Sequence, residues 1–208
     1  MKNSILFPLL FIIAIPAISQ RTKKTDFEKE RFFRVGFKAG VNINKVQGQS
    51  FKEQFRYNYS LGGFTQFNFS RKLGLQPELS FVQSSAESTN DMSDVYDDIS
   101  LNGSQLKAKL NYLKFGSLFN LNVGPTQKVK LQFGPQWGML LNQKTDSLNS
   151  PQNIFKKGDF SLAGGLLLQL PVVHIGGRFE QGLSNINNVD DTHKWKSQAW
   201  QIFAGVTF

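Results

Sequence analysis

The C-terminal segment of the chain alternates between apolar and smaller or polar side chains up to its final residue. One face of an extended strand carries the apolar set, which is Trp200, Ile202, Ala204, Val206 and Phe208. Phe203 is the one large side chain on the opposite face. Such a strand needs a neighbour on both edges, because an open edge exposes unpaired backbone groups. A closed barrel in which the last strand pairs with the first provides both neighbours.

Seven earlier segments alternate in the same way. The eight segments lie at about residues 33–42, 57–69, 73–81, 106–121, 129–141, 160–170, 173–183 and 200–208. Short turns at 70–72, 123–126 and around 171 alternate with long connections at about 43–56, 86–104, 143–158 and 186–196. About ten tilted residues cover roughly 25 Å, the height of the apolar band of outer-membrane barrels. The pattern predicts an all-β fold: an eight-stranded antiparallel up-and-down transmembrane β-barrel with short periplasmic turns and long extracellular loops.

The segment at 106–121 departs from the simple pattern. Its apolar residues change parity between Tyr112 and Leu113. A one-residue slip of parity within a strand is what a β-bulge produces. We therefore predict a bulge near these two residues.

The alternation does not itself say which face is inside. A soluble barrel of the lipocalin type would turn its apolar side chains inward around a ligand. The glycines favour the membrane alternative, because most of those in strands share the polar face, where a narrow lumen restricts side-chain size. Aromatic girdles are expected at both ends of the strands, with Tyr57, Tyr59, Trp137, Trp195 and Trp200 toward the loops and Phe33, Phe69 and Phe208 toward the turns. The general preference of aromatic residues for strands would give the same distribution.

The N-terminus has the features of an export signal. Lys2 precedes an apolar core from Ile5 to Ile15, and Ala17-Ile18-Ser19 has the small-x-small pattern of a cleavage site. The core is too short to span a bilayer as a helix, and the chain has no cysteine for a lipid anchor or a disulfide. We expect residues 1–19 to be a signal peptide, residues 20–32 a periplasmic tail, and residues 33–208 the barrel domain. Both termini then lie in the periplasm.

Five strand motifs occur in order along residues 33–208. They are FKAGVNIN at Phe37–Asn44, LGLQPELSF at Leu73–Phe81, YLKFGSLF at Tyr112–Phe119, FGPQWGM at Phe133–Met139 and GRFEQGLSN at Gly177–Asn185. Together they resemble the PorT-like outer-membrane β-barrel family of the Bacteroidetes. The third motif departs from the family pattern, with Lys114 in place of an acidic residue and Gly116 in place of a proline.

The resemblance implies an outer-membrane location and insertion by the barrel-insertion machinery. Trp200 and Phe208 are then the aromatic residues of a C-terminal sorting signal. PorT itself is associated with type IX secretion and gliding. The resemblance thus implies a role associated with secretion or the cell envelope.

Charged residues recur on the polar faces of the strands. The candidates for the lumen are Arg34, Lys38, Glu78, Lys114, Lys128, Lys130, His174, Arg178 and Glu180. Charges inside a small barrel must be paired, so we expect a structural network of Arg34, Lys38, Glu78, Lys114, Arg178 and Glu180. Its expected centres are Glu78, facing basic neighbours, and the Arg178/Glu180 pair. A narrow ion path or a proton-sensitive site at His174 is the alternative, whereas a diffusion pore is not expected in eight strands.

The chain offers little for catalysis or metal binding. His193, with Asp190 and Asp191 nearby, is a partial base-and-orienter fragment without a defined nucleophile. The acidic run at residues 91–98 lacks the spacing of a calcium loop. We expect no catalytic site, cofactor or metal. The net charge of +9 is not concentrated on a recognition motif, so no nucleic-acid partner is expected.

These observations predict a non-enzymatic outer-membrane barrel with a structural, assembly or secretion-associated role. Its expected partners are outer-membrane lipid, the barrel-insertion machinery and other proteins of the envelope or of a secretion complex. Two alternatives remain open. One is an adhesin or receptor that acts through the long loops, and the other is a lipid-modifying enzyme at the rim.

Overall fold

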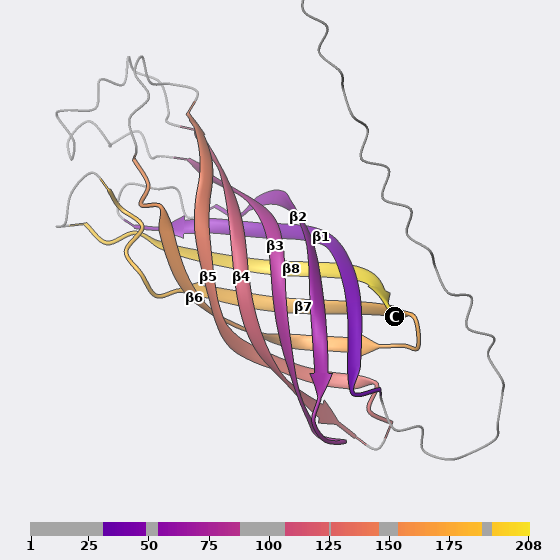
Figure 1. Cartoon of the computed structure of the whole chain (residues 1–208). Coiled ribbons are helices and arrows are strands. Elements are labelled where there is room, and N and C mark those ends of the chain that lie inside the picture. Colours follow the sequence, from indigo (N-terminus) through magenta and orange to yellow (C-terminus); the bar gives the residue numbers. More distant parts are fainter. Residues whose placement is uncertain (1–30, 49–53, 88–106, 125, 146–153, 189–192) are drawn as a thin grey trace, which may run out of the picture.

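The strands close into a single barrel. The computed structural model describes residues 31–48, 54–87, 107–124, 126–145, 154–188 and 193–208. Its strands are β1 (Phe33–Gln47), β2 (Arg56–Asn68), β3 (Leu73–Glu87), β4 (Lys107–Val123), β5 (Val129–Thr145), β6 (Gly158–Gln169), β7 (Val173–Gly182) and β8 (Lys196–Thr207). Each pairs antiparallel with its neighbours in sequence, and β8 pairs with β1 (Figure 1). The predicted fold class is confirmed, whereas residues 1–19, the expected signal peptide, lie outside the described residues.

The seam between β1 and β8 closes the barrel to the last residue. Val206 lies opposite Phe37 in the ladder. Beyond it, the Phe208 amide donates to the Val35 carbonyl at 2.8 Å, and the Val35 amide donates to the Phe208 carbonyl at 3.3 Å. The C-terminal residue therefore takes part in closure through its backbone.

The apolar faces of the strands lie on the outside. On β8, Trp200 and Ile202 are exposed, whereas the side chain of Phe203 is buried in the interior. Every strand contributes exposed large apolar side chains, among them Phe37, Leu79 and Phe133. The arrangement is the inverse of a lipocalin-type barrel and matches a barrel surrounded by lipid. No helix in the described part of the chain is long and apolar enough to cross a membrane.

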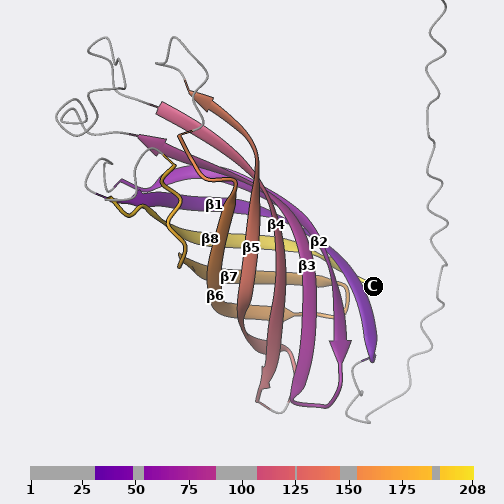
Figure 2. The ribbon, with the colours of Figure 1, turned by 60° about the vertical axis from the view of Figure 1, so that its left-hand side comes forward.

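The two ends of the barrel differ, and we name them by their connections. At the turn end β2, β4 and β6 end and β3, β5 and β7 begin, and at the loop end β1, β3, β5 and β7 end (Figure 2). At the β2–β3 turn, the Ser70 hydroxyl accepts the Lys72 and Leu73 amides at 3.2 and 3.0 Å, which stabilises the reversal. Gly124 in the β4–β5 turn has a positive φ of 80°, which glycine adopts without strain.

Several strands run further toward the loop end than the alternation indicates; β8, for example, begins at Lys196 rather than at residue 200. β1, β3 and β5 end at Gln47, Glu87 and Thr145, beyond the predicted ends at residues 42, 81 and 141. Past those positions on β3 and β5 the outward residues are no longer apolar, so the alternation that revealed the strands is lost there. On β1 the apolar Ile43 still faces outward, and Lys45 and Gln47 follow it. The ladder itself continues, with Glu87 still opposite Lys107.

The predicted bulge is present, but it lies on the partner strand. Asn111 pairs with Asn142 and Tyr112 pairs with Leu140, so the extra residue is Leu141 of β5. In β4, by contrast, the even-numbered residues face inward from one end to the other. The change of apolar parity in β4 therefore does not mark a slip: Leu110 and Tyr112 are apolar residues inside the barrel.

Two aromatic rings fill part of the lumen, and glycines make room for them. A Cβ at Gly36 would overlap the ring of Phe64, and one at Gly176 would overlap the ring of Phe203. Both rings are buried. The glycine-rich inner face of the strands is thus the counterpart of large inward side chains on neighbouring strands.

One member of the predicted aromatic girdle is elsewhere. Phe115, Trp137 and Phe160 form a continuous outward row across β4, β5 and β6, because Trp137 lies opposite both of the others. Phe179 and Trp200 pack together on the outside of β7 and β8 with ring centroids 4.7 Å apart. Trp195 is completely buried and belongs to the interior, so its assignment to the girdle was wrong.

Candidate functional site: the lumenal network and the loop-end plug

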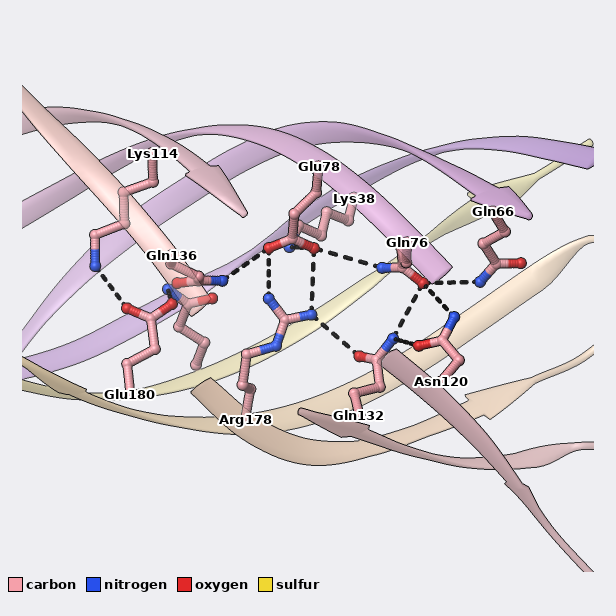
Figure 3. A network of polar contacts seen from close by, with 11 residues as sticks. Lys38, Gln66, Gln76, Glu78, Lys114, Asn120, Gln132, Gln136, Arg178 and Glu180 are labelled. Carbon is pink, nitrogen blue, oxygen red and sulfur yellow. Dashed lines mark hydrogen bonds and ion pairs between the residues drawn. The ribbon is translucent and has the colours of Figure 1, made fainter. Parts of the chain in front are cut away.

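Glu78 on β3 is the centre of the lumenal network (Figure 3). Its carboxylate accepts two hydrogen bonds from the Arg178 guanidinium on β7, at 2.6 and 3.3 Å. Lys38 Nζ on β1 donates to it at 2.9 Å. The side-chain amides of Gln136 and Gln76 donate at 2.9 and 3.4 Å. A single carboxylate therefore ties together β1, β3, β5 and β7 across the lumen.

A cluster of amide side chains extends the network toward the turn end (Figure 3). The guanidinium described above donates to Gln132 Oε1 at 3.0 Å. Gln132 Nε2 donates in turn to Gln76 Oε1 at 3.0 Å and to Asn120 Oδ1 at 2.8 Å. Gln76 Oε1 also accepts from Asn120 at 3.1 Å and from Gln66 at 2.9 Å. These amides are not among the predicted lumenal residues, although each lies at an inward position of its strand.

A second ion pair lies closer to the loop end. Lys114 Nζ donates to Glu180 Oε2 at 2.5 Å, and Gln201 Nε2 donates to Glu180 Oε1 at 2.7 Å. The prediction paired Glu180 with Arg178, its neighbour on the same face of β7. The structure instead directs Arg178 to Glu78 on the opposite wall. Pairing across the lumen satisfies each charge with a partner from a different strand, which neighbours on one strand cannot do.

Two other predicted lumenal residues lie apart from the two ion-pair groups. Arg34 is buried near the turn end, where its guanidinium donates to the Pro171 carbonyl at 2.7 Å. Lys130 is fully buried on β5. Lys128 is exposed in the turn before β5 and does not enter the lumen, so its assignment was wrong. β5 begins one residue later, at Val129, so Lys128 does not follow the inward–outward alternation of the strand.

His174 lies between aromatic rings. Its Nδ1 is 2.8 Å from the Thr207 hydroxyl. The rings of Phe64 and Phe203 lie 5.1 and 6.3 Å from the imidazole, and within the described residues its Nε2 has no hydrogen-bond partner. No carboxylate contacts this ring in the described part of the chain, so the surroundings of His174 do not resemble a proton relay.

Lys38 and Arg178 also contact the ring of Phe203. The Lys38 ammonium lies 5.0 Å and the Arg178 guanidinium 5.1 Å from the ring centroid. Cations above an aromatic face are stabilised by its quadrupole. Phe203, the exception in the alternation of β8, thus supports the two cations that share Glu78.

An apolar plug closes the lumen at the loop end. Its buried members are Val46, Ala86, Ala108, Leu110, Tyr112, Ile154, Phe155, Ile186 and Trp195, and Leu140 packs against them. Phe155 pairs with Asn187 in an isolated bridge, so the segments before β6 and after β7 fold into the barrel mouth. The sequence does contain a signal for this plug, namely the apolar residues Leu110 and Tyr112 at inward positions of β4. The sequence pattern alone attributes them to a bulge.

A small pocket separates the plug from the ion pairs. It is lined by residues of both regions, including Tyr112, Lys114 and Glu180. Asp159 lies at its edge and accepts hydrogen bonds from the hydroxyls of Ser184 and Ser197 at 3.2 and 2.6 Å. Among the described residues, no three His, Cys, Asp or Glu side chains gather as a metal site.

Residues 18–188 match the family model described as an outer membrane protein beta-barrel domain. The chain belongs to this family. Membership makes it an integral barrel of the bacterial outer membrane, and it agrees with the outward apolar band. The closing strand β8 lies beyond the matched residues.

Solved structures of small outer-membrane barrels are similar to the chain. The attachment invasion locus protein Ail of Yersinia pestis has 14% identity, with 84% of this chain and 98% of that chain covered at a TM-score of 0.50. Neisserial surface protein A has 13% identity, with coverage of 86% and 98% at 0.49. OprG of Pseudomonas aeruginosa has 14% identity, with coverage of 85% and 95% at 0.47. At such low identity the likeness to Ail shows the fold alone, and no curated protein matches the chain.

Proposed function

We propose that the protein is a non-enzymatic anchor of the outer membrane whose barrel is a rigid, closed body and conducts nothing. The observation that carries the proposal is the filled lumen. Hydrogen-bonded charges centred on Glu78 occupy its middle, and the plug around Trp195 occupies its loop end. Eight strands leave an interior that side chains can fill, and these side chains do fill it.

The topology of the proposal follows from the even number of strands. Residues 1–19 are a signal peptide that is removed, residues 20–32 are a periplasmic tail, and both termini of the barrel lie in the periplasm. The short turns are then periplasmic and the long connections extracellular, as in other outer-membrane barrels. Cysteine labelling of a single Cys introduced at Ser70 or at Lys194 in intact cells tests this. A reagent that cannot cross the outer membrane should modify only the Lys194 position.

Within the family, we place the chain in the PorT-like branch, with a role in assembly or secretion at the envelope. The support is the order of the five strand motifs along residues 33–208. Affinity purification from native membranes under mild detergent tests it. Co-purification of other envelope or secretion proteins in fixed proportion is expected, and recovery of the barrel alone would contradict a role in a complex.

Planar-bilayer recording tests the closed lumen directly. The purified full barrel should give no stepwise conductance, whereas a variant with Trp195→Ala and Arg178→Ala should conduct, because it loses part of the plug and of the network. Glu87→Gln is the matched control, since Glu87 pairs with Arg56 at the loop end and leaves the lumen unchanged. Stable open steps from the unaltered barrel would refute the anchor and favour an ion path.

The projecting strands support a second candidate, loop-mediated binding of a surface partner. β3 and β5 continue past the apolar band to Glu87 and Thr145, which lifts their connections away from the lipid boundary. Ail, similar in fold, is by its name an attachment invasion locus protein. Replacing the β3–β4 connection by a short glycine-serine loop tests this candidate. Loss of adhesion to host cells or matrix, with normal barrel assembly, would support it.

A further inference from the structure

Two lysines face each other on the outer surface of the barrel near the loop end. Lys109 of β4 and Lys144 of β5 are directly opposite in the ladder, and both are exposed. One row closer to the membrane, Asn111 lies opposite Asn142. We name these four residues the lysine patch.

The lysine patch carries an unbalanced charge. Both lysine side chains are cations, and like charges directly opposite on neighbouring strands repel each other. Within the described residues, neither lysine makes an ion pair. Glu87 is occupied by Arg56, and Asp159 points inward to two serine hydroxyls. A bound anion would remove the repulsion.

The amides below the lysines add donors to the same surface. Gln83 Nε2 donates to Asn111 Oδ1 at 3.2 Å, so the carbonyl oxygen of Asn111 is already bonded and its amide nitrogen remains as a donor. Asn142 is exposed beside it. Two ammonium groups above side-chain amides form a surface that suits a phosphate group, whose oxygens accept several charge-assisted hydrogen bonds.

The height of the lysine patch corresponds to the headgroup layer. The outward apolar residues end at Leu113 on β4 and at Leu141 on β5. Lys109 lies four residues beyond the first, or about 10 Å along the membrane normal at the usual rise and tilt, and Lys144 lies three residues beyond the second, or about 8 Å. The headgroup region on each side of a bilayer is roughly 5–8 Å thick, and a lysine stem reaches back along apolar surface toward it.

An aromatic row lies on the outer surface of the barrel beneath the lysine patch. Phe115, Trp137 and Phe160 lie side by side on the outside of β4, β5 and β6. A Cβ at Gly158, one row nearer to the loop end, would lie 3.5 Å from the indole nitrogen of Trp137, so this donor points toward the loop end. The row lies two residues below Leu113, so it belongs to the apolar band and offers apolar contact to an acyl chain.

We infer that the lysine patch is a binding site for the anionic phosphate headgroup of a membrane lipid in the leaflet at the loop end. The phosphate lies between Lys109 and Lys144 and accepts from the amides of Asn111 and Asn142. The acyl chains of the same lipid lie along Leu113, Met139 and the aromatic row. This inference rests on the proposed anchoring role and gives the anchor a specific lipid contact.

Native mass spectrometry of the full barrel, released from neutral detergent that contains a defined lipid, tests the site. Phosphatidylglycerol is the anionic probe, and phosphatidylcholine, whose choline offsets the phosphate charge, is the reference. The unaltered barrel should retain phosphatidylglycerol preferentially. Lys109→Gln with Lys144→Gln should weaken its retention, by about fivefold for each lysine removed. Arg71→Gln with Lys72→Gln, which removes two exposed charges at the turn end, should leave this binding unchanged.

Three results would overturn the inference. They are equal retention of the two lipids, equal loss in the turn-end control, and displacement of the lipid by millimolar inorganic phosphate, which would make a soluble anion the occupant. A lower unfolding temperature of the lysine variant in lipid-free detergent would also count against the site, because the lysines would then be paired within the chain. Since the lumen is unchanged in this variant, its bilayer conductance reports separately on the anchoring role.

Discussion

Replacing Glu78 by Gln removes the carboxylate that Arg178 and Lys38 share while it keeps the shape of the side chain. The side chain of Glu78 is 3% exposed, and its partners are equally enclosed. The variant leaves two buried cations, at hydrogen-bond distance from the same position, without a counter-charge. Breaking a buried ion pair by removing one partner costs about 3–5 kcal/mol, and we expect Glu78→Gln to lose that much unfolding free energy.

A second substitution separates charge from packing. Adding Lys38→Met to Glu78→Gln restores the native net charge of the cluster, with Arg178 as the remaining cation. The double variant should regain about 1–2 kcal/mol relative to Glu78→Gln, because removal of one buried, unpaired charge outweighs the loss of its contacts. Glu87→Gln is the control for the same chemical change. Its partner Arg56 is 37% exposed on its side chain, so the loss should stay below about 1 kcal/mol.

Urea unfolding of the refolded barrel in lipid vesicles measures these differences. Trp195 inside the plug and Trp137 and Trp200 on the outside provide the fluorescence signal. The shift in heat-modifiable gel mobility gives an independent reading. A loss of less than 1 kcal/mol in Glu78→Gln, or a double variant less stable than the single one, would refute the view that charge pairing across the lumen stabilises the fold.

Three further predictions concern other parts of the barrel. Ile202→Arg places a charge on the exposed apolar face of β8 and should cost about 2–4 kcal/mol, measured by the same unfolding assay; a change below 0.5 kcal/mol would contradict the facing of β8. Deletion of Phe208 should impair membrane assembly in cells, because it removes the sorting aromatic and the backbone bonds to Val35. Phe208→Ala should refold normally in vitro and fail only in cells. Normal assembly of both variants in cells would exclude a sorting role. Gly36→Ala should destabilise the barrel by about 1–3 kcal/mol because its methyl group overlaps Phe64. Phe64→Leu in the same chain should recover part of the loss. The absence of any recovery would mean that the overlap is not the cause.

The alternation of side chains predicted the eight strands and, together with the position of the glycines, the facing of most of their residues. On β5, Leu131 and Phe133 are outside and Gln132 is inside, as the parity indicates. The prediction of facing is reliable because neighbouring residues of a strand face lipid and lumen in turn, so apolar and polar side chains alternate with a period of two. Where the two faces of a strand have similar surroundings, as beyond residue 81 of β3, neighbouring side chains no longer differ in polarity. The strand end is then predicted too early.

The partners inside the lumen could not be derived from the parity. Parity places Glu78, Arg178 and Glu180 on inner faces, but it does not give the stagger that brings Arg178 opposite β3. It also places Gln132 inside without showing that its amide is bonded to Arg178 at 3.0 Å. A substitution such as Gln132→Arg, which the pattern alone suggests is mild, would put a second cation beside that guanidinium.

The plug escaped prediction for a related reason. Leu110 and Tyr112 were judged as outward residues because apolar side chains lie outside in the rest of the barrel. At the loop end the interior is covered by residues 154–155, 186 and Trp195, which exclude water and make an apolar interior favourable. Contacts of this kind join segments distant in sequence, and no local pattern records them.

The central ion pair joins residues that are 100 positions apart in the chain. Lys38 lies on the first strand, Glu78 on the third and Arg178 on the seventh, so the charges of the interior are compensated only when nearly all of the barrel is present. A partly assembled sheet would expose these groups to water, where hydration compensates for the missing partners. The buried charges thus favour the complete barrel over a partial one. In a partial sheet they stay hydrated, and only when the last strand pairs with the first can they be buried with their partners.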